Sequence, residues 1–505
     1  MNQDKHEKVM NIALRRGFIW PSFEIYGGLA GFFDFGPLGT LLKNKIIQKW
    51  REYYVLREGF FEIDSPSIMP EEVLKASGHA DHFIDLMIEC KKCGSAFKAV
   101  DVVKDAIGRD VEGISKEEIG QIVMENKIRC PECGGELGPV YEFNAMFRTT
   151  IGPGGGRVGF LRPETAQGIF VNFKRLQRYA RGKLPFGVVQ IGKGYRNEIS
   201  PRQGIIRLRE FTMAEAEVFF DPGNPHHPKF SSISEERLRL WSAEDQQNGR
   251  TDLIEVTAGQ AVNDGIVCNE LMAYYIALTK LLLQDIGIPN DAIRFRQQTP
   301  GQRAHYSSET WDAEVLTQRF GWVEVAGLAY RTDYDLSRHA KSSGEDLTVF
   351  LPDQNKKVLC HVVEPSYGID RPLYCLLEHS FVDDGKRQYF KFKRSMSPIE
   401  VSVLPLLNRD GLPEKAIEIY ERLRREGFMA EYDDAGSIGR RYARADEIGT
   451  PYCITIDHKT MSDDTVTIRD RDTTSQIRVE TSKLSSVLHQ LLGEGIKFEE
   501  AGAPI

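Results

Sequence analysis

Charged and aromatic side chains are concentrated in one stretch of the chain, 190–217 (QIGKGYRNEISPRQGIIRLREFTMAEAE). It follows a short apolar run, and its last part places Arg207, Arg209, Phe211, Met213 and Glu215 at every second position. This pattern predicts two antiparallel strands joined by a long polar loop. Side chains two positions apart share a face of a strand, and those sharing one here are Arg196 and Glu198, then Arg207, Arg209 and Phe211. Guanidinium groups bind phosphate oxygens, a carboxylate accepts from an exocyclic amine, and an aromatic ring stacks on a base. The stretch therefore predicts a nucleotide site, although an exposed hairpin with ordinary surface charge would show the same local pattern.

Four of the eight cysteines form two close pairs, Cys90 with Cys93 and Cys130 with Cys133. Thirty-six residues separate the pairs, and a glycine follows each one directly. The two thiolates of a C-x-x-C turn can face one metal ion, and four thiolates suit tetrahedral zinc. Four sulfur ligands leave no open coordination position, so the predicted zinc is structural. The alternatives are two disulfides, which conflict with a cytosolic chain, and four unrelated thiols, which conflict with the paired spacing.

Composition limits the class of protein. A chain of 505 residues is too long for one core and predicts two or three domains. The net charge of −8 and the pI near 5.9 argue against a surface coated for nonspecific binding to DNA or other nucleic acid. A local basic face could still bind a tRNA. The N-terminal residues carry scattered charges and no window of 18 apolar residues occurs, so we expect a cytoplasmic protein with no membrane partner.

Apolar periodicity predicts the elements that must position these groups. Residues 38–57 and 264–287 show helical spacing. Residues 321–330 read as a buried strand that carries one charge, Glu324, and a carboxylate inside an apolar strand needs a partner. After 393–398, strands and helices alternate, which is typical of a separate α/β domain of about 100 residues.

Three sequence motifs stand in the order found in class II aminoacyl-tRNA synthetases. REGFFEIDSPSI (57–68) resembles their motif 1, YRNE followed by RLREF (195–211) resembles motif 2, and EPSYGIDR (364–371) resembles motif 3. The variants are similar to those of the dimeric glycyl-tRNA synthetases. So are four further stretches: EIYGGLAGFFDFGPLG (24–39), FLRPETAQGIFVNF (160–173), AHYSSETWDAE (304–314) and GWVEVAGLAYRTDYDLSRH (321–339). The resemblance extends from about Arg15 to about Arg478.

This resemblance implies an α+β fold. A class II antiparallel sheet would form the catalytic domain, with a zinc-knuckle insertion, and a C-terminal α/β domain would bind the anticodon. The implied divisions are 1–85 for the catalytic part with motif 1, 86–139 for the insertion, 140–395 for the part with motifs 2 and 3, and 397–505 for the anticodon-binding domain. The candidates for tRNA contacts in that last domain are Arg440, Arg441, Arg444, Arg469 and Arg471. The helix and strand of motif 1 would form a homodimer interface.

The resemblance also implies the reaction and its cofactors. Glycine would be activated by ATP to glycyl-adenylate and transferred to the 3′ end of tRNA(Gly), with no side-chain nucleophile. Arg196, Glu324 and Arg371 are the expected catalytic residues, and Glu324 would help to hold Mg²⁺. The expected ATP-binding residues are Arg196, Asn197, Glu198, Ile206, Arg207, Leu208, Arg209, Glu210, Phe211, Glu324, Val325, Gly368, Ile369, Asp370 and Arg371.

The chemistry of glycine explains why carboxylates should surround it. Glycine has no side chain, so its affinity must come from charge-assisted hydrogen bonds to the ammonium group, for which Glu164, Glu215, Glu364 and the Ser366 hydroxyl are candidates. A pocket closed against one methyl group would exclude every larger competitor. The expected substrate-binding residues are Lys98, Glu164, Phe211, Thr212, Met213, Ala214, Glu215, Glu364, Pro365, Ser366, Tyr367 and Gly368. At Lys98 the chain reads KAVD where many relatives read RADH, so a solvated lysine is the alternative there.

Two other classes of protein could share parts of this sequence pattern. A synthetase-like paralogue would activate an amino acid without charging tRNA, which the C-terminal α/β pattern argues against. A noncatalytic zinc-containing RNA-binding protein would not need both Arg196 and Arg371.

Overall fold

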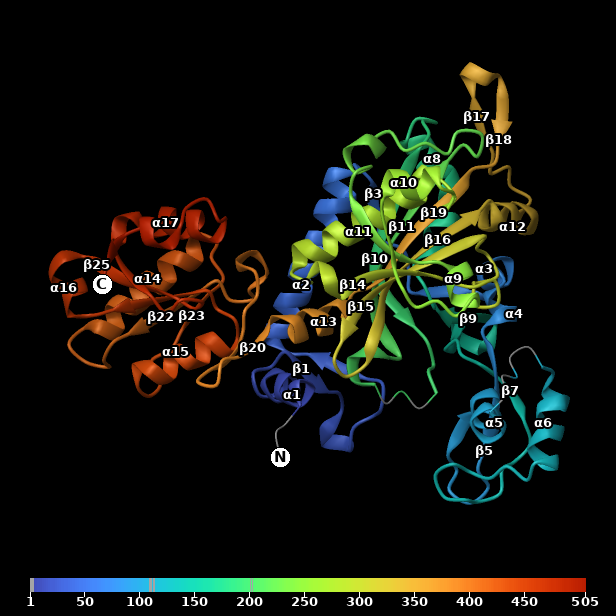
Figure 1. The fold of residues 1–505 in the computed structure, drawn as a ribbon, viewed down its shortest axis with the longest axis horizontal. Helices are drawn as coiled ribbons and strands as arrows, with labels where there is room; N and C mark the ends of the chain where they lie inside the picture. The colour runs from blue at the N-terminus through green and yellow to red at the C-terminus, as the bar shows by residue number, and fades with distance from the viewer. Residues whose placement is uncertain (1–3, 109–110, 112–113, 200, 202) are drawn as a thin grey trace.

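A long, mostly antiparallel sheet organises the larger part of the molecule (Figure 1). The computed structural model describes residues 4–108, 111, 114–199, 201 and 203–505. Within them the nine strands follow the order β13 (Ile254–Thr257), β12 (Arg237–Trp241), β14 (Ile293–Gln297), β15 (Glu309–Thr317), β16 (Gly321–Thr332), β19 (His361–Gly368), β11 (Glu210–Phe220), β10 (Phe186–Tyr195) and β3 (Phe61–Ile63). Neighbours pair antiparallel except β3 with β10 and β12 with β14. The predicted antiparallel sheet is confirmed.

Three helices cover one face of this sheet and build the main core (Figure 1). They are α2 (Pro37–Arg51), α11 (Glu270–Ile286) and α13 (Asp370–Ser380). Helix α11 begins six residues later than its pattern predicts, because Asn269 caps it by accepting from the Met272 amide. Since these helices occupy one face, side chains on the opposite face of β11, β16 and β19 are free to build a site.

Smaller elements surround this body. The N-terminal segment contains α1 (Lys5–Arg15), β1 (Ile19–Pro21) and β2 (Phe33–Phe35), and a π-helical turn, Glu52–Arg57, extends α2. The remaining elements of this part are β4 (Ile68–Pro70), α3 (Glu71–Ala76), α4 (His79–His82), β8 (Arg148–Ile151), β9 (Arg157–Leu161), α7 (Ala166–Phe170), α8 (Phe173–Tyr179), α9 (Ala243–Gln247), α10 (Ala258–Asn263), α12 (Tyr334–Ser343), β17 (Val349–Leu351), β18 (Lys356–Val358), β20 (Phe381–Asp383) and β21 (Gln388–Phe390).

A small cysteine-containing insertion extends from one end of the body (Figure 1). It consists of β5 (Ile84–Glu89), β6 (Ala96–Lys98), α5 (Ala99–Ile107), α6 (Lys116–Glu125) and β7 (Tyr141–Asn144), and it has a core of its own. Strand β5 pairs with both β6 and β7, so the two ends of the insertion leave the body side by side.

The C-terminal part is a mixed α/β unit with a second core (Figure 1). Its sheet follows the order β23 (Ala430–Tyr432), β22 (Val401–Pro405), β24 (Tyr452–Ile456), β25 (Thr465–Asp470), β26 (Gln476–Glu480) and β27 (Ala503–Pro504). Its helices are α14 (Leu412–Arg425), α15 (Ile438–Glu447), α16 (His458–Asp463) and α17 (Leu484–Leu492). No helix in the described residues combines the length and the apolar character needed to cross a membrane.

Candidate active site

The stretch 190–217 forms the expected hairpin, but its charged residues lie in the connection rather than on the strands. Strand β10 ends at Tyr195, which pairs with Glu210 at the start of β11. Arg196 and Glu198 follow the first strand, and Arg207 and Arg209 precede the second, so the prediction that they share strand faces is wrong. The two arms stay close because the Arg196 amide donates to the Arg209 carbonyl at 2.9 Å. Ser200 and Arg202 of the same loop lie outside the described residues.

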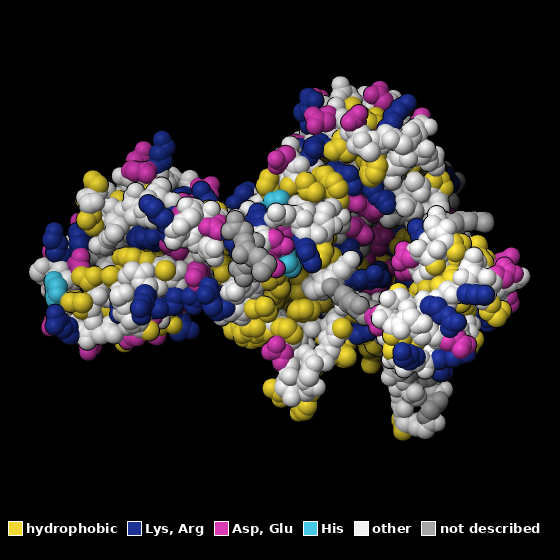
Figure 2. Space-filling view, turned by 60° about the horizontal axis from the view of Figure 1, so that its bottom comes forward, with side chains coloured by type: hydrophobic (Ala, Val, Ile, Leu, Met, Phe, Trp, Pro, Cys, Tyr) yellow, Lys and Arg dark blue, Asp and Glu magenta, His cyan; other side chains and the backbone are white. Residues whose placement is uncertain are grey.

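The hairpin forms one wall of a cavity of about 290 Å³ on the free face of the sheet. Figure 2 shows a hollow in which acidic side chains gather beside Lys and Arg side chains. The predicted site residues that line it are Glu164, Arg196, Glu198, Ile206, Arg207, Leu208, Phe211, Met213, Glu215, Glu324, Val325, Glu364, Ser366, Gly368, Asp370 and Arg371. The structure thus brings residues of motif 2 and motif 3 together with Glu164 and with Glu324 of strand β16.

Other predicted residues do not line this cavity. Strand alternation turns Thr212, Ala214, Pro365 and Tyr367 toward the opposite face, where Tyr367 bonds to the hydroxyls of Tyr54 and Thr279. Ile369 is packed in the main core. The backbone N–H of Asn197 donates to the Ala145 carbonyl, and the Arg209 guanidinium donates to the carbonyls of Ala30 and Glu198. Glu210 forms an ion pair with Lys193.

Lys98 also lies away from the main cavity. Its ammonium group is 2.7 Å from a carboxylate oxygen of Asp85 in the insertion. It lines a second cavity of about 440 Å³ beside the insertion, and Arg207 lines both cavities. Lys98 therefore does not line the cavity that contains Glu164, Glu215 and Glu364.

One end of the main cavity is cationic and aromatic. The Arg196 guanidinium carbon lies 5.5 Å from the centre of the Phe211 ring, which is cation–π distance. Arg371, in the first turn of α13, donates to the carbonyls of Ile206 and Glu324 at 3.0 and 2.8 Å. Its guanidinium also lies 3.4 Å from a carboxylate oxygen of Glu324. Stacking surface and guanidinium groups in one hollow suit a nucleotide with its phosphates.

Two acidic residues face each other at the edge of this end. Glu324 is half exposed and turned to the cavity, so the prediction that it is buried in an apolar strand is wrong. Asp312 on the neighbouring strand β15 is buried and accepts from Gln298 at 2.8 Å. Burial, and next the charge of Glu324, raise the pKa of Asp312 to about 7. The sequence analysis missed Asp312, although it stands in the AHYSSETWDAE stretch at an inward strand position.

The opposite end of the cavity is lined by glutamates. Glu215 accepts from the Thr165 and Ala166 amides at 2.6 and 2.9 Å, from the Thr165 hydroxyl, and from the Ser366 hydroxyl at 2.7 Å. The donors of Thr165 and Ala166 lie at the start of α7, where the helix dipole favours a carboxylate, and Ser366 lies on strand β19. The pocket thus contains a carboxylate whose position is fixed by four donors.

A buried arginine that the sequence analysis missed holds the other two glutamates. The Arg331 guanidinium lies 2.9 Å from Glu364 and 3.6 Å from Glu164, donates twice to Asp335, and stacks 3.7 Å above the Tyr306 ring. Its signal in the sequence is the i,i+4 pair of opposite charges directly after a buried strand.

The two glutamates held by Arg331 differ in their protonation. Burial opposes the charge of Glu164, but His79 at 3.2 Å and Arg331 outweigh it and keep the pKa of Glu164 below its ordinary value. Burial raises the pKa of Glu364 to about 8 against the pull of Arg331, and Glu215 and Glu164 add to the rise. An incoming ammonium group would meet at least one firmly ionised carboxylate, Glu164, and a second, Glu364, that it can ionise.

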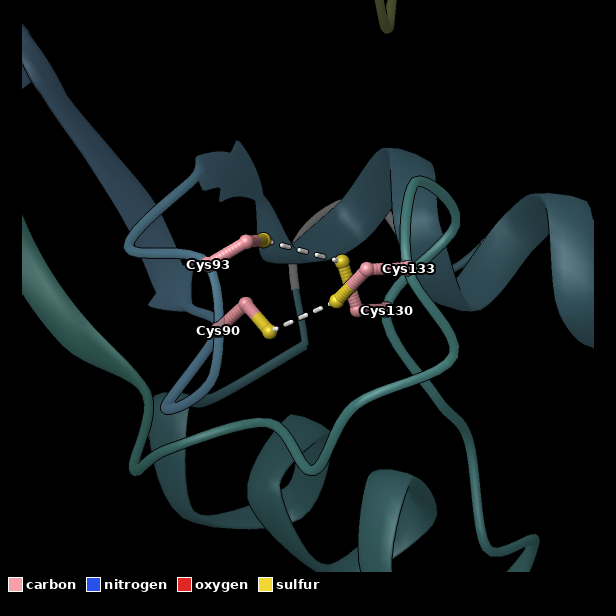
Figure 3. A group of neighbouring side chains, drawn as sticks. All are labelled: Cys90, Cys93, Cys130 and Cys133. Atoms are coloured by element: carbon pink, nitrogen blue, oxygen red, sulfur yellow. Dashed lines mark hydrogen bonds between the residues drawn. The ribbon is translucent and has the colours of Figure 1, made fainter.

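The four paired cysteines meet in the insertion. Figure 3 shows their sulfur atoms converging from two loops. The Cys90 and Cys133 sulfurs are 3.5 Å apart, those of Cys93 and Cys130 are 3.7 Å apart, and all four lie within 4.8 Å of one another. Zn–S bonds of about 2.3 Å place tetrahedral sulfurs about 3.8 Å apart, so the donor set fits zinc, whereas a disulfide requires about 2 Å. The predicted cluster of four cysteines is confirmed.

The arginines expected to contact tRNA fall into two groups. Three of them are buried and bonded to protein: Arg441 to the Asp434 and Gly436 carbonyls, Arg469 to Asp446 by two hydrogen bonds of 2.8 and 2.9 Å, and Arg471 to the Gly449 and Phe392 carbonyls. Arg444 is half-buried and pairs with Asp433. Arg440 is exposed. Arg441, Arg469 and Arg471 are therefore wrong as tRNA contacts, since burial leaves no guanidinium edge for RNA.

Comparisons with known proteins agree with this geometry. A family model described as the tRNA synthetase class II core domain (G, H, P, S and T) matches residues 155–380, and one described as an anticodon binding domain matches residues 400–491. The prolyl-tRNA synthetase of Giardia lamblia in complex with prolyl-adenylate has a similar fold, with a TM-score of 0.60 at 16% identity over 95% of this chain and 74% of that chain. The enzyme of Cryptosporidium parvum gives 0.57 at 13% identity over 96% and 77%.

The fold, the cavity and these matches define a class II aminoacyl-tRNA synthetase. Two proteins described as glycine--tRNA ligase, from Methanothermobacter thermautotrophicus and Pyrococcus furiosus, are 48% and 50% identical to this chain over 97% of its length and 99% and 100% of theirs. A third, from Methanocaldococcus jannaschii, is 47% identical over 98% of this chain and all of its own. The chain belongs to the glycine--tRNA ligase family.

Proposed function

We propose that the protein activates glycine with ATP and transfers the glycyl group to the 3′ end of tRNA(Gly). The observation that carries this proposal is a single cavity with a cationic, aromatic end at Arg196, Phe211 and Arg371 and an acidic end at Glu164, Glu215 and Glu364. A nucleoside triphosphate fits the first end and the ammonium group of an amino acid fits the second.

The first step joins the two ligands. An oxygen of the glycine carboxylate attacks the α-phosphorus of ATP in line with the leaving group, and the bond to pyrophosphate breaks. Negative charge grows on the phosphoryl oxygens, so Arg196 at the α-phosphate, with Arg207 and Arg371 at the terminal phosphates, stabilises the transition state. Phe211 stacks on the adenine ring and Glu198 accepts from its amino group.

In the second step a hydroxyl of the terminal tRNA ribose attacks the acyl carbon and AMP leaves. The acidic end holds the ammonium group in both steps. The acyl carbon therefore keeps its position between the formation of glycyl-adenylate and the attack by the ribose hydroxyl. No covalent bond to a side chain is needed in either step.

The acidic end also accounts for the choice of glycine. Ammonium recognition by Glu164 and Glu364 is common to every amino acid, so the discrimination rests on space beside the α-carbon. Met213, Ser366 and Tyr306 line the cavity, and Ser366 and Tyr306 contact Glu215 and Arg331 of its acidic end. A methyl group at the α-carbon would meet these side chains, and alanine would be rejected by overlap.

Two metals belong to this proposal. Mg²⁺ would be held by oxygen ligands of Glu324 and of Asp312, which lie on neighbouring strands at the phosphate end, and would neutralise phosphate charge. Zinc would be held by Cys90, Cys93, Cys130 and Cys133 and would fix the insertion in its folded form.

We further propose a homodimer that uses the motif 1 region. Strand β3 is the last strand of the main sheet, and an edge strand offers unpaired backbone groups to a second chain. Leu56 and Tyr179 beside it are 72% and 71% exposed, which is high for large apolar side chains. We propose the same division of the chain as the sequence suggests, at 1–85, 86–139, 140–395 and 397–505.

Pyrophosphate exchange into ATP across a panel of amino acids tests this function. We expect exchange with glycine and at least about 100-fold less with alanine and serine. Charging of tRNA(Gly) by the same preparation distinguishes a complete enzyme from one that only activates glycine. Exchange that another amino acid supports equally well would contradict the proposal, and size-exclusion chromatography with light scattering tests the dimer.

A further inference from the structure

A buried ion pair lies at the nucleotide end of the cavity. Lys43, on helix α2, is 9% exposed, and its ammonium nitrogen is 2.6 Å from a carboxylate oxygen of Asp370. Asp370 is 2% exposed, and the Phe35 ring covers the lysine at 4.0 Å. Each charge has lost nearly all its water, so each depends on the other.

Asp370 uses its second carboxylate oxygen to hold strand β11. That oxygen accepts the Thr212 amide at 2.8 Å, and the Ile369 amide donates to the Thr212 carbonyl at 2.9 Å. Thr212 stands between Phe211 and Met213, whose side chains line the cavity. The start of α13 is thereby fastened to the strand that carries the stacking ring.

Asp370 also directly precedes Arg371. The Arg371 guanidinium crosses the cavity wall to the Ile206 and Glu324 carbonyls. A shift of the first turn of α13 would therefore move the guanidinium group and the Phe211 ring relative to each other. Both are assigned above to ATP.

We propose that Lys43 is a positioning residue for ATP, which acts through Asp370 to fix the distance between Phe211 and Arg371. The inference rests on the proposed placement of ATP at this end of the cavity. It also links α2, the helix before the motif 1 strand, to motif 2 through Thr212 and to motif 3 through Arg371. Neither partner of the pair needs to touch the nucleotide for this effect.

Neighbouring charges do not replace Lys43. Lys193 and Glu210 are the other charged groups whose fields act on it, and they are paired with each other at 3.1 Å. Replacing Lys43 with methionine keeps the length of the side chain but leaves the Asp370 carboxylate buried without a counter-charge. The carboxylate must then take up a proton or turn toward water, and either change weakens its hold on Thr212.

The main test is steady-state pyrophosphate exchange by full-length Lys43→Met. We expect KM for ATP to rise about 10- to 100-fold and KM for glycine to rise by a much smaller factor, because the pair fixes both Phe211 and Arg371 but reaches the glycine end only through Met213. Lys280→Met is the matched control. Lys280 lies on α11 against the same face of the sheet, is 6% exposed, and pairs at 2.5 Å with Glu236, and neither residue lines the cavity. It should lower the melting temperature and leave both KM values unchanged.

A second variant keeps the test informative if Lys43→Met folds poorly. The double variant Lys43→Met with Asp370→Asn contains no unpaired charge, so it should melt at a higher temperature than Lys43→Met. Its KM for ATP should lie between those of the wild type and Lys43→Met. The effect of the double variant on KM would then be smaller than the sum of the effects of Lys43→Met and Asp370→Asn.

Three outcomes would overturn the inference: an unchanged KM for ATP in Lys43→Met, a parallel rise of both KM values, or strictly additive effects in the cycle. Failure of the proposed function looks different, since the wild type itself would then show no glycine-dependent exchange.

Discussion

Arg207 and Glu198 form an ion pair across the mouth of the cavity. One carboxylate oxygen of Glu198 is 2.8 Å from Nε of Arg207 and 2.6 Å from a terminal nitrogen of the same guanidinium. The two residues that we assign to the base and to the phosphates of ATP thus hold each other when no nucleotide is present. ATP must exchange this pair for its own contacts, so part of its binding energy is used to open the mouth.

Arg207→Ala tests separately how much the ion pair contributes to stability and how much Arg207 contributes to ATP binding. Because Arg207 is 40% exposed, solvent screens the pair and we expect a loss in the free energy of unfolding below about 1 kcal/mol. KM for ATP should nevertheless rise, since a phosphate ligand is lost. The exposed Arg175→Ala on α8 is the control for exchange kinetics. An unchanged KM in Arg207→Ala would show that the guanidinium serves only to neutralise Glu198.

Arg196→Ala should lower pyrophosphate exchange by about 10²-fold or more, because it removes a cation placed where charge grows in the transition state. Among the described residues its guanidinium makes one long hydrogen bond, 3.4 Å, to the Pro163 carbonyl, and it lies beside the rings of Phe83 and Phe211. The melting temperature should therefore change little. Exchange close to the wild-type rate would refute the assignment.

Asp312 should make the stability of the protein depend on pH. Its pKa is about 7 in the folded protein and about 4 in an unfolded chain, so between these values the folded state holds a proton that the unfolded state has lost. This contribution is complete below about pH 4 and is lost as the pH rises to about 7. Asp312→Asn does not titrate, and its melting temperature relative to the wild type should rise between pH 5 and pH 7.5. The exposed Asp353→Asn should show no such trend, and a flat difference for Asp312→Asn would contradict the prediction.

Zinc removal should unfold the insertion before the catalytic body. We expect one zinc per chain by elemental analysis, and loss of that zinc in Cys130→Ser. Limited proteolysis should then cut between β5 and β7, because the small core of the insertion lacks its crosslink. Cys268→Ser changes an exposed cysteine outside the cluster and should retain the metal. Full zinc content in Cys130→Ser would exclude the four-sulfur site.

The effect of replacing a C-terminal arginine should depend on whether its side chain is exposed or buried. Arg440→Ala removes an exposed cation and should raise KM for tRNA several-fold without affecting pyrophosphate exchange, which needs no tRNA. Arg469→Ala removes two hydrogen bonds to the buried Asp446 carboxylate, which keeps Arg387 at 3.1 Å, and should cost about 2 kcal/mol of stability. The opposite pattern, with a stable Arg469→Ala defective in charging, would place the RNA on a different surface.

The sequence by itself determined the local elements and the family. The hairpin, the helix before motif 1 and the two C-x-x-C turns are encoded by periodicity and close spacing, and the order of three motifs identifies the class of enzyme. These signals survive in a linear chain because they depend on neighbours a few positions apart.

Only the tertiary structure decided which side chains face each other. It turned Tyr367 and Ala214 away from the cavity, buried Arg469 against Asp446, and brought Lys43 to Asp370 and Arg331 to Glu364. The partner of a charged group depends on how distant elements pack, and burial decides whether that group binds a ligand or another part of the protein. A sequence pattern shows neither of these.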